Sequence, residues 1–320
     1  MRILVTGGSG FAGQYLLDYL QQVEPEAKLI ATTIDVAPTN PQLATVDWVV
    51  VNLLDTQAVF DLLKNHQPDI IYHLAALSAP SKALTAAWQT LENNVKMQFN
   101  LIHACIELNI SPQILLITSG DIYDTRSNTG DPIAEETPLC ANNPYALSKI
   151  TQDMMGLQYY LSHQLPIIRI RPFNHTGAGQ ALGFVAPDFA MQIARIEAGL
   201  QEPIIRVGNL EAYRDFSDVR DVVKAYYFIS KYGEAGEAYN VASGKATSIA
   251  MLLQQLIDAT DIDIDVQVDT AKLRPVDTPI IVGSAQKLTT LTGWQPTIDI
   301  QTTLHDLLHD CRERVLAKST

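Results

Sequence analysis

The chain has 320 residues, of which 47% are hydrophobic and 18% are charged, as in a folded globular protein and unlike a disordered or fibrous one. Its formal net charge of -13 at pH 7 repels the phosphates of nucleic acids and anionic lipid headgroups. We therefore expect neither a nucleic-acid partner nor a membrane partner.

The first residues and the cysteines indicate a cytoplasmic protein. The N-terminal segment MRILVTGGSG runs directly into a predicted strand, and no apolar run approaches the ~20 residues of a membrane span. The three cysteines, Cys105, Cys140 and Cys311, are far apart and lack the spacing of a metal site. We expect free thiols and no bound metal.

Short β-rich apolar runs alternate with longer helical patterns through the first half of the chain. Strands are predicted at 3–5, 29–33, 48–51, 70–74, 114–118 and 167–170. Helices are predicted at 10–22, 55–65, 90–108 and 145–163. This alternation is typical of an α/β fold, a Rossmann-type doubly wound parallel sheet with helices on both faces.

A glycine-rich run follows the first predicted strand and opens the first predicted helix. Gly7 permits a tight turn, Gly10 lets the backbone approach a pyrophosphate, and Gly13 lets the helix pack closely on the strand. The helix N-terminus adds N–H donors and partial positive charge. The Gly-x-x-Gly-x-x-Gly spacing, which also contains Phe11, resembles the extended short-chain dehydrogenases/reductases. This resemblance implies a bound NAD or NADP.

The choice between NAD and NADP depends on the residue that ends the second strand. A carboxylate there accepts from the ribose 2′-hydroxyl, whereas an arginine meets a 2′-phosphate. Asp35 lies one or two positions from the expected place and is equally well explained as a solvated turn residue, so the preference stays open.

Two further strand ends match cofactor contacts of the family. Asn52 and Leu53 follow the third strand, where relatives commonly carry an aspartate that contacts adenine, so the change to Asn52 weakens this match. Leu74, Ala75 and Ala76 follow the fourth strand, where the resemblance implies small residues along the cofactor.

A Tyr-x-x-x-Lys pair opens the fourth predicted helix, and a serine follows the fifth strand. By resemblance, Ser119, Tyr145 and Lys149 form the catalytic triad and Asn94 matches an active-site asparagine. Tyr145 would donate a proton to a carbonyl held by Ser119, while the Lys149 ammonium lowers the tyrosine pKa and holds the cofactor ribose. A lone histidine in an apolar strand, His73, is predicted to be a hydrogen-bonded core residue.

Segments in the second half of the chain narrow the resemblance to the GDP-6-deoxy-4-keto-D-mannose reductases. They are 171–177 (RPFNHTG), 184–190 (FVAPDFA), 207–210 (VGNL) and 214–222 (RDFSDVRDV). The resemblance implies that hydride from NAD(P)H reduces the 4-keto group of GDP-4-keto-6-deoxy-D-mannose, giving GDP-D-rhamnose.

The same resemblance implies four contacts to the GDP-sugar. Asn174 contacts the sugar or diphosphate, Asn209 lies by the nucleotide, and Arg214 and Arg274 clamp the diphosphate. Two arginines that fork to phosphate oxygens offset the acidic net charge. Alternatively, Arg214 forms a salt bridge to a nearby aspartate, Asp215 or Asp218.

Three other activities stay open. A GDP-mannose 4,6-dehydratase shares most of these motifs, and Asp121 supplies a carboxylate where dehydratases carry a glutamate, although Gly120 beside it supplies no second acid. Another nucleotide-sugar epimerase or dehydratase uses the same triad. A cofactor-binding sensor without turnover is disfavoured by the intact Ser119, Tyr145 and Lys149.

The chain is predicted to form two structural units and to assemble as a homodimer. Residues 1–172 are predicted to form the dinucleotide-binding domain, with segments near 209–245 returning to it, and 173–320 are mainly a smaller C-terminal substrate-binding lobe. By resemblance, the helices near 90–108 and 145–163 of two subunits form a four-helix bundle in a homodimer.

Overall fold

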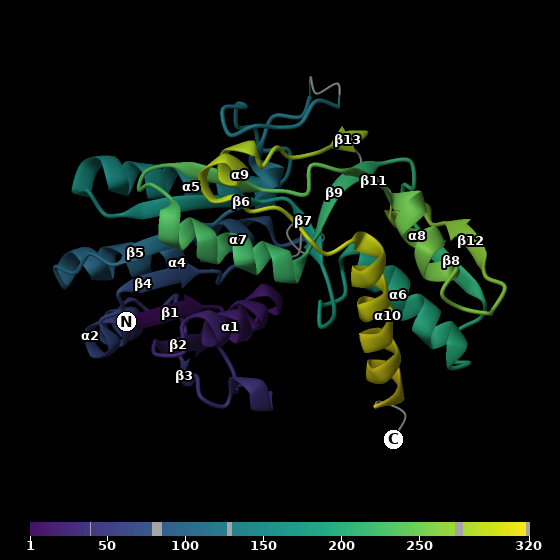
Figure 1. Cartoon of the computed structure of the whole chain (residues 1–320), viewed down its shortest axis with the longest axis horizontal. Helices are drawn as coiled ribbons and strands as arrows, with labels where there is room; N and C mark the ends of the chain where they lie inside the picture. The colour runs from purple at the N-terminus through teal and green to yellow at the C-terminus, as the bar shows by residue number, and fades with distance from the viewer. Residues whose placement is uncertain (39, 79–84, 127–129, 273–277, 318–320) are drawn as a thin grey trace.

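The computed structural model describes residues 1–38, 40–78, 85–126, 130–272 and 278–317. Seven parallel strands form its central sheet, in the order β10-β6-β5-β4-β1-β2-β3 (Figure 1). These strands are β1 (Arg2–Thr6), β2 (Lys28–Thr33), β3 (Asp47–Val50), β4 (Ile70–His73), β5 (Gln113–Ile117), β6 (Ile167–Pro172) and β10 (Ala238–Val241). The predicted doubly wound parallel sheet is confirmed.

Helices cover both faces of the sheet, as buried strands of a parallel sheet require. One face carries α1 (Phe11–Val23) and α7 (Val219–Tyr232), which share a core with residues of β1, β2 and β6. The other face carries α2 (Thr56–His66), α4 (Ala87–Glu107) and α5 (Pro144–His163). Helix α4 begins three residues before its predicted start at residue 90.

The strand order reverses between β1 and β4, because the chain leaves β1 towards β2 and β3 and then crosses back to β4. In open α/β sheets, ligands bind at the carboxyl ends of the strands beside such a reversal. The segments after β1, β4 and β5 therefore mark the edge of the sheet at which a site is expected.

A second body of elements lies beyond this edge (Figure 1). Its core joins three helices, α6 (Val185–Glu197), α8 (Ile249–Ile257) and α10 (Ile300–Leu316), and Cys311 is buried within it. The parallel pair β8 (Ile204–Val207) and β12 (Asp265–Val268) flanks these helices. Among the described residues, no helix is both long and apolar enough to cross a membrane.

A small sheet connects the two bodies. Strand β9 (Tyr213–Asp218) pairs with β7 (Asn174–Thr176), β11 (Ala246–Ser248) and β13 (Ile280–Ile281). Helix α9 (Gln286–Thr292) contacts α7 and β10. Residues near the carboxyl ends of β6 and β9 therefore face the same edge of the central sheet as the glycine loop.

Candidate active site

The glycine loop adopts a geometry that side chains cannot share. Gly7 has a φ of +69°, and a Cβ there would lie 2.9 Å from the backbone of Ala75. A Cβ at Gly13 would lie 2.5 Å from the carbonyl oxygen of Gly7. Gly10 precedes α1 and offers no side-chain cap to its first N–H groups. Such a loop fits a dinucleotide diphosphate, which would approach the backbone and the helix N-terminus.

Phe11 and the residues after β4 border this loop. The Phe11 ring stacks on His175 with centroids 6.2 Å apart, so α1 contacts the segment that follows β6. The Ala75 N–H lies 3.4 Å from the Thr6 hydroxyl, and Leu74, Ala75 and Ala76 are partly buried. The structure therefore brings the segment after β4 to the loop.

The candidate adenosine contacts lie farther out. Asp35 is exposed, two residues beyond the end of β2, and Asn52 is exposed beyond β3. The Asn52 side chain accepts from the Leu54 N–H at 3.0 Å, which stabilises its own turn, while Leu53 is buried in the core under α2. Asp35 and Asn52 are therefore exposed beyond the ends of their strands, whereas Leu53 packs inward.

Local capping fixes where the tyrosine and lysine project. Asn143 caps α5 by accepting from the Ala146 N–H at 2.9 Å, and Pro144 occupies the first helical position. Tyr145 is then the second helical residue, and Lys149 follows one turn later. The Lys149 Nζ donates to the Ile117 carbonyl at 2.9 Å and lies 5.9 Å from the centroid of the Tyr145 ring.

Ser119 completes the arrangement from the end of β5. It begins the 3-10 turn η2 (Gly120–Ile122), and its hydroxyl accepts from the Asp121 N–H at 3.1 Å. The Ser119 hydroxyl also lies close enough to the Tyr145 hydroxyl to lower its pKa. Two hydroxyls and an amine from separate elements therefore converge at the carboxyl edge of the sheet.

Burial controls the charges in this cluster. It raises the pKa of the Tyr145 hydroxyl; the Asp121 carboxylate raises it further, and the hydrogen bond with Ser119 lowers it. Burial also lowers the pKa of Lys149 to about 7. The expected lowering of the tyrosine pKa by the Lys149 ammonium is not found, because burial raises the pKa of Tyr145 and leaves Lys149 only partly charged near neutral pH.

Asn94 and His73 support the cluster from neighbouring elements. Asn94 is fully buried; its amide donates to Ser148 at 3.0 Å, and its oxygen accepts from the Leu77 N–H at 2.7 Å. It thereby joins α4, α5 and the segment after β4. His73 is buried with Nδ1 2.8 Å from the Thr6 hydroxyl, which confirms the predicted core position, and burial lowers its pKa to about 3.

The predicted sugar and diphosphate contacts surround the same edge. Asn174 and Asn209 are exposed, at the start of β7 and just after β8. The Arg214 guanidinium donates to the carbonyls of Tyr213 and Thr278 at 2.7 and 2.8 Å. Arg274 lies outside the described residues.

The aspartates considered as partners of Arg214 are engaged elsewhere. Asp215 accepts from the N–H groups of Ser243, Gly244 and Gly283 at 2.7 to 3.1 Å. Asp218 caps α7 and pairs with Arg220 at 2.7 Å. The salt bridge considered between Arg214 and one of these two aspartates is therefore not formed.

Sequence reasoning missed a buried polar cluster behind Ser119. Arg169 and Arg171 alternate with isoleucines in β6 and both contact Asp153 on α5. The signal was present, since two arginines at period two in an apolar strand place two charges on one face of the sheet and require a buried counter-charge. Among the described residues, no group of three or more His, Cys, Asp or Glu side chains is arranged to hold a metal.

Comparisons with known proteins agree with this geometry. Residues 4–307 match the family model described as GDP-mannose 4,6 dehydratase. The chain is 34% identical to a GDP-6-deoxy-D-mannose reductase of Pseudomonas aeruginosa over 98% of each chain, and 27% identical to a GDP-6-deoxy-D-talose 4-dehydrogenase of Aggregatibacter actinomycetemcomitans over 92% of each.

Solved structures give the same result. The structure of RMD from Pseudomonas aeruginosa complexed with NADPH superposes with a TM-score of 0.83 at 33% identity, covering 98% of this chain and 99% of that one. Its similarity extends through the sheet and the second body. The chain therefore belongs to the GDP-mannose 4,6-dehydratase family, within the extended short-chain dehydrogenases/reductases.

Proposed function

We propose that this protein is an NAD(P)H-dependent reductase that converts GDP-4-keto-6-deoxy-D-mannose into GDP-D-rhamnose. The observation that carries the proposal is the convergence of Ser119, Tyr145 and Lys149 at the carboxyl edge of the sheet, the same edge at which the glycine loop lies. The similarity to a GDP-6-deoxy-D-mannose reductase supports the GDP-sugar, and the similarity to a 4-dehydrogenase supports chemistry at the same carbon.

The roles of the residues follow from where their polar atoms lie. The nicotinamide supplies the hydride when it is bound. Ser119 holds the carbonyl oxygen of the sugar, and Tyr145 donates a proton to that oxygen as negative charge develops on it. In its ammonium form, Lys149 would stabilise the tyrosinate that remains and, as the resemblance implies, would hold the cofactor ribose.

The placement of the remaining ligand groups rests on the resemblance and on exposure. We assign the cofactor to residues 1–172 and the segments near 209–245, with Asp35 and Asn52 at the adenosine. The GDP-sugar contacts Asn174, Asn209, Arg214 and Arg274. We place the enzyme in the cytoplasm.

A dehydratase is the second candidate, because the matching family model carries that description. Water elimination needs a base and an acid, and Asp121 offers one carboxylate. A Cβ at position 120 would lie 2.9 Å from the Phe173 ring, so the chain has no room there for a second acidic side chain. This contact favours the reductase.

The deciding experiment follows the absorbance of NADPH and of NADH with purified protein. GDP-4-keto-6-deoxy-D-mannose is offered in one series and GDP-mannose in the other. We expect consumption with the keto sugar alone, lost in Tyr145→Phe. Conversion of GDP-mannose to the keto sugar without net consumption of cofactor would contradict the reductase and make Asp121 the base of a dehydratase.

We also propose a homodimer through α4 and α5, which pack on each other in one subunit. Leu147, Met154 and Leu161 are exposed and lie seven residues apart, so they form one apolar stripe along α5, and Trp88 and Phe99 are exposed on α4. Light scattering tests the dimer. Met154→Glu should yield monomers, whereas Leu200→Glu, an equally apolar exposed position on another surface, should not.

A further inference from the structure

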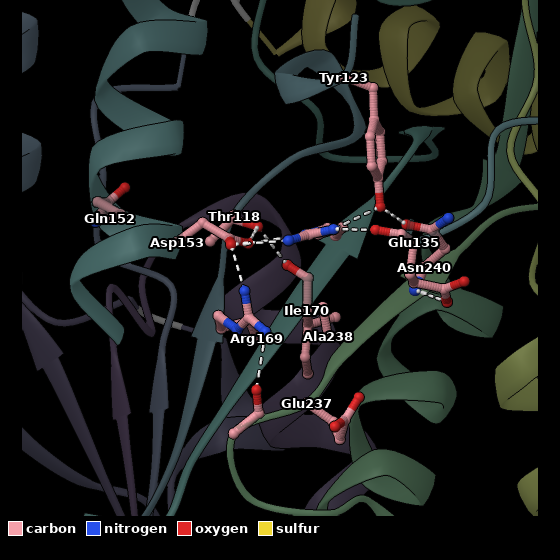
Figure 2. A network of polar contacts seen from close by, with 12 residues as sticks. Thr118, Tyr123, Glu135, Gln152, Asp153, Arg169, Ile170, Glu237, Ala238 and Asn240 are labelled. Atoms are coloured by element: carbon pink, nitrogen blue, oxygen red, sulfur yellow. Dashed lines mark hydrogen bonds and ion pairs between the residues drawn. The ribbon is translucent and has the colours of Figure 1, made fainter. Parts of the chain in front are cut away.

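A buried chain of polar contacts runs behind the candidate active site (Figure 2). We call it the Asp153 network, and its members are Asp153, Arg169, Arg171, Tyr123 and Asn240. Each of these residues is less than a tenth exposed, and they come from α5, β6, β10 and the segment after η2. The proposed chemistry assigns no role to any of these five residues.

One end of the network holds the helix that carries the tyrosine and lysine. Asp153 lies one turn after Lys149 on α5 and is fully buried. Its Oδ2 and Oδ1 accept from the Nε and Nη2 of Arg171, both at 2.8 Å, which is a two-pronged contact. Oδ1 also accepts from Arg169 Nη1 at 2.8 Å. Both carboxylate oxygens are therefore fixed against β6.

The other end holds the turn that carries the serine. Tyr123 directly follows η2, and its hydroxyl accepts from Arg171 Nη1 at 2.9 Å and donates to Asn240 Oδ1 at 2.6 Å. Its ring stacks against Phe173, with centroids 6.2 Å apart. Figure 2 shows the Tyr123 side chain reaching from η2 towards Asn240, with Asp153 on the far side of the network.

Arg171 is the link between the two ends. Its single planar guanidinium contacts the carboxylate of α5 on one edge and the tyrosine hydroxyl on another, so its fixed shape sets their separation. Charge-assisted hydrogen bonds are strong where water is excluded, and each donor involved has a defined direction. The guanidinium thus couples the position of α5 to the position of η2.

We propose that Arg171 and Tyr123 are positioning residues for carbonyl reduction, and that they hold the Ser119 and Tyr145 hydroxyls at the separation that lets both reach one carbonyl oxygen. This inference rests on the proposed reductase function. The two hydroxyls belong to separate elements, η2 and α5, and a misplacement of about 1 Å can lower a rate on the order of 100-fold.

The test compares two variants that each lose one buried tyrosine hydroxyl. Tyr123→Phe interrupts the network while it retains the ring against Phe173. Tyr239→Phe is the matched control, because its hydroxyl is buried on β10 and accepts only from the Glu234 N–H among the described residues, at 3.1 Å. Circular dichroism and NADPH binding by fluorescence verify that both variants fold and load cofactor.

We expect Tyr123→Phe to lower kcat about 10- to 100-fold, with KM for the keto sugar changed less than about 3-fold, and Tyr239→Phe to change neither. The alkaline limb of the kcat profile should move in Tyr123→Phe alone, because the pKa of Tyr145 depends on its bond with Ser119. Crystal structures should show that bond lengthened in Tyr123→Phe.

Arg171→Lys provides a second variant that retains the charge and loses the planar fork. It should reproduce the loss of kcat and add little when combined with Tyr123→Phe. A Tyr123→Phe enzyme with a lower melting temperature but an unchanged kcat and Ser119–Tyr145 contact would overturn the positioning role. If the wild-type protein does not reduce the keto sugar, the proposed function is wrong. The crystal structures would still show whether Tyr123→Phe changes the distance between the Ser119 and Tyr145 hydroxyls.

Discussion

Two groups of buried ionisable side chains lie close together, and the chain satisfies them differently. In the Asp153 network, the carboxylate meets two guanidinium groups. In the site, Lys149 is buried with a backbone carbonyl as its acceptor and no carboxylate partner among the described residues, and the Nε2 atom of His73 has no hydrogen-bond partner. Buried charges that are paired hold a structure together, whereas buried groups left incomplete mark where a ligand can complete them.

The largest effect is expected when the Asp153 network loses its only carboxylate member, Asp153. Asp153→Asn leaves two buried arginines without their carboxylate and should lower the free energy of unfolding by about 3–5 kcal/mol, measured by urea denaturation. Asp47→Asn is the control, since its pair with Lys28 is exposed and should contribute less than about 1 kcal/mol. Equal effects of the two substitutions would refute the distinction.

In the site, by contrast, the folded chain should become more stable when the pH rises and the buried Lys149 loses its proton. The pKa of Lys149 is lowered from 10.5 to about 7 in the folded chain, so the unfolded chain binds the extra proton between these values. Stability should therefore rise by about 2 kcal/mol between pH 7 and pH 9 from this group. Denaturation of Lys149→Met across the same range should lack this increment, and an identical slope in both proteins would contradict the assigned pKa.

His73 offers the same test on the acid side. Its folded pKa of about 3 lies below the ordinary value of 6.5, so the unfolded chain binds the proton first as the pH falls. About 1.5 kcal/mol of stability should be lost between pH 6.5 and pH 5 because of this residue. Thermal melts of His73→Phe in that range should show a shallower decline than those of the wild type.

The smallest effect is expected for Asp35, an exposed carboxylate that belongs neither to the site nor to the Asp153 network. Asp35 is exposed after β2, and in the proposed adenosine site its carboxylate would repel a 2′-phosphate through partly screened solvent. Asp35→Ser should raise the ratio of kcat/KM for NADPH to that for NADH by roughly 3- to 10-fold. An unchanged ratio would place the 2′-position away from this residue.

The sequence predicted the parallel sheet and the meeting of Ser119, Tyr145 and Lys149 because both depend on local signals. Apolar runs define the strands. Asn143 and Pro144 fix the start of α5, so that Tyr145 lies in the first turn of this helix. Parallel strands then bring their carboxyl ends to one edge without further information.

What the sequence did not predict depends on burial and on distant pairing. The lowered pKa of Lys149 arises from desolvation by elements that meet only in three dimensions. The contact between Arg171 and Tyr123 joins residues 48 positions apart, and the contact between Tyr123 and Asn240 joins residues 117 positions apart. Strands β7, β9, β11 and β13 were also missed, because the first three are mostly polar and β13 has only two residues, so none of them presents an apolar run.

The place of β10 has a consequence for synthesis on the ribosome. This strand completes the edge of the central sheet against β6, although α6, β8, β9 and α7 lie between them in the chain. While residues after Pro172 are still being made, β6 presents its unpaired edge, which is a template for association with other chains. Since Asn240 on β10 also closes the hydrogen bond of Tyr123, the nascent sheet gains a protected edge and a complete polar network in the same step.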